Sequence, residues 1–152
     1  MSGFTEFLYE LFSNTILLSG VVGWLTAQVI KTIIFAITNH GINWSRLVGD
    51  GGMPSGHSAT VTAIAVSCGI QDGFDSPVFA VACIMAIIVM HDAMGVRRET
   101  GKQSEVLNHL VEVVYSKTLS PEEKLKEFVG HTPLQVFFGF LLGLVIALIM
   151  NF

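Results

Sequence analysis

Four long apolar stretches dominate this sequence and limit what it can fold into. They cover approximately residues 15–38, 55–70, 77–90 and 134–152. A helix that crosses the hydrocarbon core of a bilayer needs about 20 apolar residues, within a range of roughly 17–25. The first and fourth stretches satisfy this length, whereas the second and third satisfy it only with their polar ends included. The pattern predicts an all-α integral membrane bundle of about four transmembrane helices, with a buried or re-entrant helix as the alternative for the second stretch.

The composition agrees with a membrane protein. Charged residues make up 13% of the chain and hydrophobic residues 51%, whereas an ordinary soluble domain carries about 25% charged residues. The length suits one membrane-embedded domain over residues 1–152. The net charge is −4 and the sequence contains no basic stripe, so no nucleic-acid partner is expected. Cys68 and Cys83 both lie in apolar runs, so neither a disulfide framework nor a metal site is indicated.

The distribution of positive residues predicts an orientation. Six of the eight Lys and Arg lie between the third and fourth stretches, and Arg46 lies between the first and second. Residues 1–14 and the loop at 71–76 carry none. Because positive residues favour the cytoplasmic side, we expect both termini outside. Residues 102–129 combine an apolar face at helical spacing with a capping box that begins at Ser120, which predicts amphipathic helices at the cytoplasmic surface.

With this topology, polar residues from separate segments fall at one depth in the membrane, toward the cytoplasmic side. Gln28 and Lys31 are three residues apart, so they share a helical face. The other segments contribute PSGH at 54–57, His91, Asp92, Arg97, Arg98, His131 and Thr132. Ionisable residues inside a membrane mark functional sites. A purely structural scaffold would not explain why these groups fall on one side.

The stretch 51–60, GGMPSGHSAT, predicts an anion site at a helix N-terminus. Unpaired backbone N–H groups and the positive end of the helix dipole favour an anion there, phosphate above all. The glycines let the backbone approach a ligand closely, so Ser55 and Gly56 are expected to contact the phosphate. His57 then faces the same anion with a titratable nitrogen. The alternative is a glycine-rich turn before a helix, with His57 merely hydrogen-bonded.

The cations and histidines around this stretch fit phosphoryl transfer. Lys31, Arg97 and Arg98 would neutralise phosphate oxygens, and arginine binds them bidentately. One histidine would attack phosphorus, and another would protonate the leaving oxygen. No cofactor is required. A Mg²⁺ ion held by Asp92 and Glu99 is the weaker alternative, because no paired acidic cage is present.

Four segments of the chain resemble a known family. They are AQVIK at 27–31, GGMPSGHSA at 51–59, HDAMGVRRETGKQSEVLN at 91–108 and GHTPLQVFFG at 130–139. Together they resemble the divergent membrane branch of the type 2 phosphatidic acid phosphatase superfamily, to which vanadium-dependent haloperoxidases also belong. The resemblance implies a metal-independent phosphatase in a membrane. Nothing in the sequence suggests a secreted, soluble haloperoxidase.

The resemblance also implies roles for individual residues. Lys31 matches the lysine of the superfamily pattern, and His57 matches the motif histidine, which implies the general acid. Arg97 or Arg98 would replace the later arginine. His131 would replace the nucleophile.

The chain departs from the superfamily pattern around these histidines. Gln135 stands where an acid is expected, and it would orient the ring of His131 by hydrogen bonding. Gln28 is assigned an orienting role beside the lysine. His57 as the nucleophile, with Asp92 as its orienting acid, is the alternative assignment.

These observations support two functional hypotheses. The first is a lipid-phosphate phosphatase of the bacterial plasma membrane, with its site on the cytoplasmic side. Its substrate would be a phosphomonoester or diphosphate on phosphatidylglycerophosphate, phosphatidate or an isoprenyl phosphate. The second is a membrane protein or transporter that binds phosphate or a phospholipid without turnover, since one fold hosts many functions.

Two further expectations concern packing and the remaining histidines. Gly139 and Gly143 have the GxxxG spacing of close helix contacts. Such a contact would lie within the chain or between copies of a homo-oligomer. His40, His91 and His109 are expected to be structural or exposed.

Overall fold

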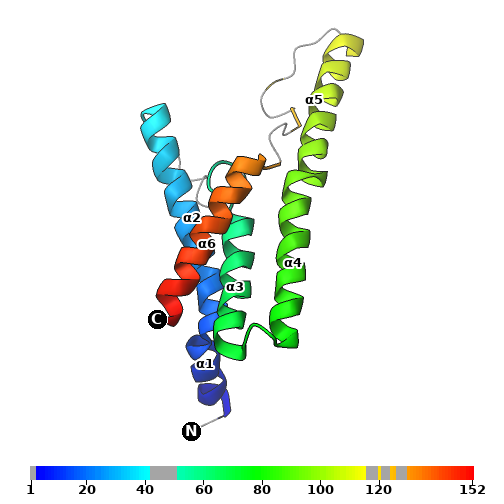
Figure 1. The fold of residues 1–152 in the computed structure, drawn as a ribbon. Coiled ribbons are helices and arrows are strands. Elements are labelled where there is room, and N and C mark those ends of the chain that lie inside the picture. Colours follow the sequence, from blue (N-terminus) through cyan, green and yellow to red (C-terminus); the bar gives the residue numbers. More distant parts are fainter. Residues whose placement is uncertain (1–2, 42–50, 116–119, 121–123, 126–129) are drawn as a thin grey trace.

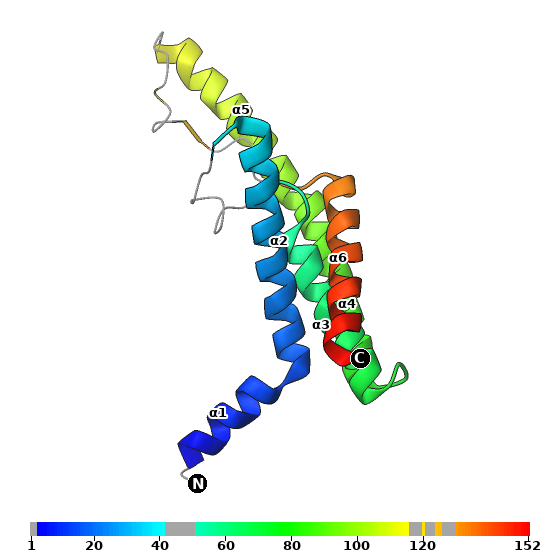
Figure 2. The ribbon, with the colours of Figure 1, turned by 90° about the vertical axis from the view of Figure 1, so that its left-hand side faces the viewer.

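The computed structural model describes residues 3–41, 51–115, 120, 124–125 and 130–152, and these residues form an all-helical fold (Figure 1). The helices are α1 (Gly3–Ser13), α2 (Thr15–Asn39), α3 (Gly56–Asp72), α4 (Pro77–Met94), α5 (Val96–Tyr115) and α6 (Pro133–Asn151). Helices α2, α3, α4 and α6 run side by side, and α5 continues the line of α4 beyond them. Helix α1 bends away from α2 and contributes no buried residue (Figure 2).

Each helix of the bundle begins at a capping residue. The side chains of Asn14, Ser55, Ser76 and Thr132 each accept a hydrogen bond from the backbone N–H three residues on, as N-cap residues do. A proline occupies the start of α4 and of α6, where its missing N–H costs nothing. Polar residues at the ends of the apolar stretches therefore define where the helices start.

Helix α3 lies at the centre of the bundle, in contact with α2, α4 and α6. Its buried residues are all small: Gly56, Ser58, Ala59, Thr62, Ala63, Ala65, Ser67, Cys68 and Gly69. A Cβ on Gly139 of α6 would overlap the carbonyl oxygen of Ser55, and one on Gly143 would overlap that of Ala59. The GxxxG spacing of α6 therefore serves close packing against α3 within the chain.

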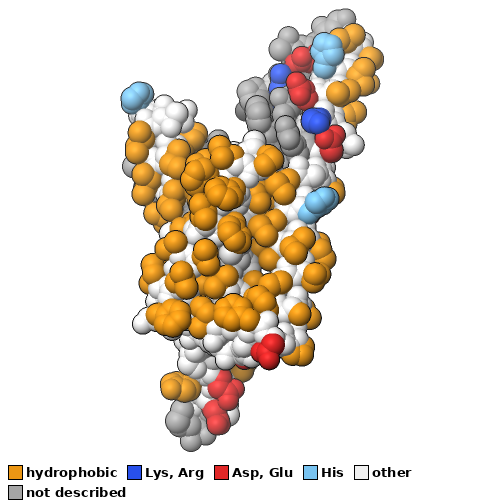
Figure 3. Space-filling model, in the orientation of Figure 1, with side chains coloured by type: hydrophobic (Ala, Val, Ile, Leu, Met, Phe, Trp, Pro, Cys, Tyr) orange, Lys and Arg blue, Asp and Glu red, His pale blue; other side chains and the backbone are white. Residues whose placement is uncertain are grey.

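Three helices among the described residues are long and apolar enough to cross a membrane. They are Thr15–Asn39, Pro77–Tyr115, in which α4 and α5 count as one helix, and Pro133–Asn151. Helix α3 has 17 residues and is not one of them, so the predicted count of four is not confirmed. Its central position matches the alternative of a buried helix. Hydrophobic side chains cover the middle of the face seen in Figure 3, acidic side chains lie toward both ends, and basic side chains lie toward the end with α5.

The amphipathic segment predicted after the third stretch is described only in part. Helix α5 begins at Val96, earlier than the predicted 102, and leaves the bundle. Its predicted apolar face is exposed at Val106, Leu107, Leu110, Val111 and Val114. Asn108 binds the backbone of Leu125 twice, through Nδ2 to the carbonyl at 3.0 Å and through Oδ1 from the N–H at 2.9 Å. Most of the second predicted helix, after Ser120, lies outside the described residues.

Candidate functional site

Lys31 brings a positive charge to the N-terminus of α3. Its Nζ donates a hydrogen bond to Oε1 of Gln28 at 2.8 Å, and the side chain is only 8% exposed. A Cβ built on Gly56 would lie 3.6 Å from the same nitrogen, so the ammonium lies against the first residue of α3. The amide of Gln28 is uncharged, so this hydrogen bond orients the ammonium without neutralising it. An ammonium beside the positive end of a helix favours an anion between them.

The loop before α3 guides the lysine to that position. Gly51 and Gly52 have φ angles of 84° and 80°, which glycine adopts without steric cost. The Cγ and Cδ atoms of Lys31 lie 3.8 and 3.9 Å from where a Cβ on Gly52 would be. The aliphatic part of the lysine therefore passes close to the loop before its ammonium reaches Gly56.

Two serine hydroxyls stabilise the first turn of α3. Oγ of Ser55 accepts hydrogen bonds from the N–H of Ser58 at 3.3 Å and from its hydroxyl at 3.0 Å. Both side chains are fully buried. The N–H of Ser55 donates to the carbonyl of Gln135 at 2.9 Å, which ties the loop to α6. Ser55 thus holds the loop in place, and its direct contact with phosphate remains a prediction.

The two imidazoles that the sequence singles out lie side by side. The ring centroids of His57, in the first turn of α3, and His131, just before α6, are 6.0 Å apart, with an interplanar angle of 63°. The backbone N–H of His131 donates to the carbonyl of Ala93 at 2.9 Å. This hydrogen bond ties His131 to the last turn of α4. The ends of α3, α4 and α6 therefore meet around one histidine pair.

Gln135 determines which nitrogen of His131 carries a hydrogen. Oε1 of Gln135 accepts the backbone N–H of Thr132 at 3.0 Å, which identifies this atom as the oxygen. The same atom lies 3.2 Å from Nδ1 of His131. An oxygen acceptor at this position requires Nδ1 to donate, and this assignment follows from the hydrogen-bond network. In the neutral ring, the lone pair then belongs to Nε2.

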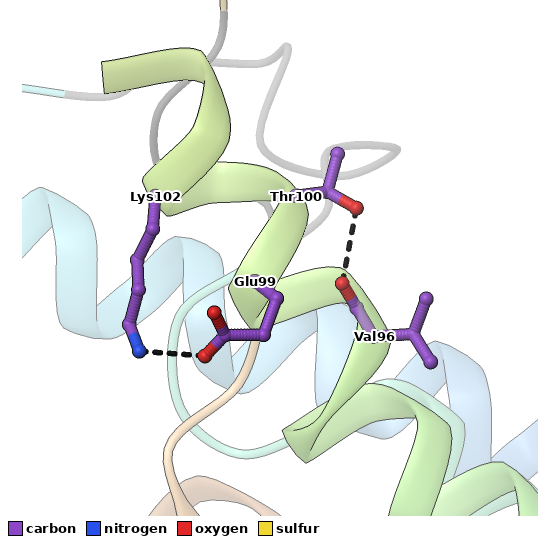
Figure 4. A network of polar contacts seen from close by, with 4 residues as sticks. All are labelled: Val96, Glu99, Thr100 and Lys102. Carbon is purple, nitrogen blue, oxygen red and sulfur yellow. Dashed lines mark hydrogen bonds and ion pairs between the residues drawn. The ribbon is translucent and has the colours of Figure 1, made fainter. Parts of the chain in front are cut away.

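Asp92 and Glu99, the two carboxylates considered for Mg²⁺, lie in different surroundings. Asp92 is half-buried in the last turn of α4, next to the residue whose carbonyl binds His131. Glu99 lies on α5 and pairs with Lys102 at 2.6 Å, with both side chains exposed (Figure 4). In the part of the chain that the structure describes, no group of three His, Cys, Asp or Glu gathers in a way that would hold a metal ion.

The arginines of the predicted site are not placed by the structure. The side chains of Arg97 and Arg98 lie outside what it describes. The histidines expected to be structural or exposed, His40, His91 and His109, are all exposed. Among the predicted site residues, the structure therefore brings together Lys31, Gln28, Ser55, Gly56, His57, His131 and Gln135, with Asp92 at the adjoining end of α4.

Trp24 and the groove beside it belong to this region but were not predicted from the sequence. Cδ1 of Trp24 lies 3.5 Å from where a Cβ on Gly56 would be. A groove of about 610 Å³ begins here and is lined by Leu17, Gly20, Val21, Trp24, His57, Thr60, Val61, Ile64 and Val89. The signal was available, because Trp24 precedes Gln28 by four residues and Lys31 by seven, which is the spacing of one helical face.

Comparison with known proteins identifies the family. Residues 12–146 match the family described as "Divergent PAP2 family". The chain belongs to this family. It is 40% identical over 155 residues to the "Uncharacterized membrane protein YuiD" of Bacillus subtilis (strain 168), an alignment that covers 94% of this chain and 98% of the relative. No solved structure matches the chain.

Membership of the divergent PAP2 family confirms the resemblance drawn from the four sequence segments. It makes the chain a phosphatase-related membrane protein. The apolar helices agree with a membrane location. In this divergent PAP2 protein, the PSGH stretch forms the start of the central helix, and its histidine contacts the ring of His131.

Proposed function

We propose that this protein is a membrane phosphatase that removes phosphate from a lipid phosphomonoester or diphosphate through a histidine-based transfer. The observation that carries the proposal is the arrangement around the N-terminus of α3. The buried ammonium of Lys31 and the imidazoles of His57 and His131 all lie there. Phosphoryl transfer depends mainly on positioning and charge stabilisation, and this arrangement supplies both.

In the proposed first step, Nε2 of His131 attacks phosphorus. An N–P bond forms as the bond between phosphorus and the leaving oxygen breaks. His57 donates its proton to that oxygen, so the lipid leaves as an alcohol, or as a monophosphate when the substrate is a diphosphate. In the second step, a water molecule attacks the phosphohistidine and His57 takes its proton. Phosphate is released and both histidines return to their starting states.

The neighbouring residues hold the charge that this reaction moves. Lys31 and the first backbone N–H groups of α3, including that of Gly56, would bind the phosphate oxygens. Arg97 and Arg98 belong to the first turn of α5 and would add bidentate contacts. In the alternative assignment His57 is the nucleophile, and Asp92 orients it.

The proposed substrate is a lipid that reaches the site from within the bilayer. Phosphatidylglycerophosphate, phosphatidate and isoprenyl phosphates all present a phosphate group at the end of an apolar body. The positive-residue distribution supports a site on the cytoplasmic side of a bacterial plasma membrane, because six of the eight Lys and Arg lie at 97–126.

Phosphate release from lipid vesicles tests the proposal. Purified protein should release inorganic phosphate from at least one of these lipids. His57→Ala and His131→Ala should each lower the rate about 100-fold or more, as expected for loss of a general acid or a nucleophile. His91→Ala is the matched control, because His91 is exposed on α4, and it should retain the wild-type rate. Equal rates for wild type and His57→Ala would overturn the catalytic role of His57.

One observation supports a second function, binding without turnover. Nδ1 of His131 contacts the neutral amide of Gln135, at the position where the superfamily pattern has an acid, and an amide does not stabilise an imidazolium as a carboxylate would. The same site would then bind phosphate or a phospholipid as a transporter or scavenging protein. Acid-quench trapping with ³²P-labelled lipid phosphate separates the two functions. A phosphoenzyme that is absent in His131→Ala supports the phosphatase, whereas saturable binding with no phosphoenzyme and no phosphate release supports the alternative.

A further inference from the structure

The groove beside His57 is formed by two matching helical faces. On α2 its lining residues are Leu17, Gly20, Val21 and Trp24, and on α3 they are His57, Thr60, Val61 and Ile64. Both sets have the spacing i, i+3, i+4, i+7, so each is one continuous stripe along its helix. Val89 of α4 completes the lining. The volume of about 610 Å³ falls within the range of small-molecule sites, about 300–1,000 Å³.

The two ends of this groove differ in chemical character. At one end lie Trp24 and His57, next to the ammonium of Lys31. Toward the other end the lining is aliphatic. The one hydroxyl in the lining, that of Thr60, donates to the carbonyl of Gly56 at 2.8 Å, so its hydrogen is not offered to a ligand. The groove itself is apolar and the ammonium of Lys31 lies beyond its Trp24–His57 end, so the two together are complementary to an amphiphile with an anionic head.

The length and direction of the groove match a lipid held in one leaflet. The stripe on α3 runs from the first turn at His57 to Ile64, halfway along the helix. Seven residues of helix rise about 10 Å, and half of the hydrocarbon core measures about 15 Å. The groove thus leads from the histidine pair toward the middle of the bundle, as the tail of a lipid must.

We propose that this groove binds one hydrocarbon chain of the substrate lipid, with the phosphate group at the N-terminus of α3. The inference rests on the proposed function for the identity of the head group. One stripe from each helix forms the two long walls, so the groove accepts a single chain. A second chain, where the lipid has one, stays in the bilayer.

Gly20 determines the width of the groove. A Cβ on Gly20 would lie 2.7 Å from Cγ1 and 2.8 Å from Cδ1 of Ile64, so any side chain there displaces Ile64. Glycine at this position lets the two stripes approach while the space between them stays open. Gly20 is therefore a specificity-determining residue for the chain.

A groove-filling substitution tests the proposal by kinetics. Val21→Trp places a large ring in the groove, and Val29→Trp is the matched control, because Val29 lies on the same helix, outside the lining, with similar exposure (49% against 45%). For Val21→Trp, kcat/KM should fall about tenfold for hexadecyl phosphate and stay unchanged for the chainless para-nitrophenyl phosphate. Val29→Trp should change neither value. Equal effects of Val21→Trp on both substrates, or no effect on either, would overturn the proposal.

Photolabelling tests the groove without any need for turnover. Hexadecyl phosphate with a diazirine in the first half of the chain should label residues 17–24 and 60–64, in wild type and in His57→Ala alike. Val21→Trp should abolish this labelling, and Val29→Trp should retain it. Labelled groove residues without phosphate release from any lipid would contradict the phosphatase and leave the groove supported. Phosphate release with labelling spread over all lipid-facing helices would contradict the groove alone.

Discussion

At the scale of single residues, two side-chain amides position groups of the candidate site. Gln28 holds the ammonium of Lys31, and Gln135 holds Nδ1 of His131. An amide directs a charged or titratable group without compensating its charge. Each amide therefore positions a group of the candidate site, and replacing either member of a pair should have a specific effect.

Replacing Lys31 should weaken the binding of tetrahedral oxyanions. Lys31→Met keeps the apolar stem and removes the charge. Hydrogen bonds to charged groups contribute about 1.5–3 kcal/mol, so the inhibition constant of vanadate should rise about tenfold to a hundredfold. Lys102→Met is the control, because Lys102 is exposed and paired with Glu99, and it should leave inhibition unchanged. Equal inhibition of wild type and Lys31→Met would exclude Lys31 from the site.

Substitutions at Gln135 should show whether its acceptor oxygen supports phosphoenzyme formation. Gln135→Leu removes the acceptor of Nδ1, so phosphoenzyme formation should fall about 10- to 100-fold, as for other residues that orient a reacting ligand. It also removes the cap that Oε1 provides to Thr132. Gln135→Glu keeps an acceptor for both partners and should restore phosphoenzyme formation. A rate for Gln135→Glu as low as that of Gln135→Leu would contradict the orienting role.

At the scale of elements, helix boundaries are encoded locally and were therefore predictable. The apolar stretches at 15–38 and 77–90 became α2 and α4 because a polar cap precedes each of them and apolar residues fill the turns that follow. The start of α5 was misjudged. The amphipathic segment was predicted to begin at residue 102, but the N–H of Gly95 binds the carbonyl of His91 at 2.8 Å and the helix resumes at the next residue.

Contacts between elements were less accessible to sequence reasoning. Lys31 and His57 were predicted to lie close together because both interrupt apolar stretches with polar residues at the same expected depth in the membrane. Whether Trp24 and His57 line the same groove depends on how far α2 is rotated toward α3, and a single sequence does not fix that rotation. Likewise, the GxxxG spacing at Gly139 predicted close contact but left its partner open, and the structure supplies α3.

Packing of α6 against α3 should be sensitive to a single methyl group. A Cβ on Gly143 would overlap the carbonyl oxygen of Ala59 and lie 2.8 Å from Cβ of Thr62. Gly143→Ala should therefore cost about 1–3 kcal/mol of unfolding free energy, measured by denaturation in mixed micelles. Gly3→Ala is the control, because nothing lies within 4 Å of its Cβ position. A Gly143→Ala protein as stable as Gly3→Ala would show that the two helices pack less closely than described.

At the scale of the whole molecule, the arrangement of polar groups gives the bundle two different ends. Both termini and the turn between α3 and α4 lie toward one end, and α5 extends from the other (Figure 1). The histidine pair lies at the end from which α5 extends, because His131 is tied to the last turn of α4. Whichever side of the membrane receives α5 therefore also receives the candidate site.

Cysteine labelling on intact bacterial cells should establish that side. In a Cys68→Ala/Cys83→Ala background, Asp75→Cys and Gln103→Cys place single thiols at exposed positions at the two ends. The positive residues at 97–126 predict that α5 is cytoplasmic. A membrane-impermeant maleimide should then label Asp75→Cys in intact cells and Gln103→Cys only after permeabilisation. Labelling in the reverse order would move the site to the outer face, where its substrate would be a lipid phosphate of the outer leaflet.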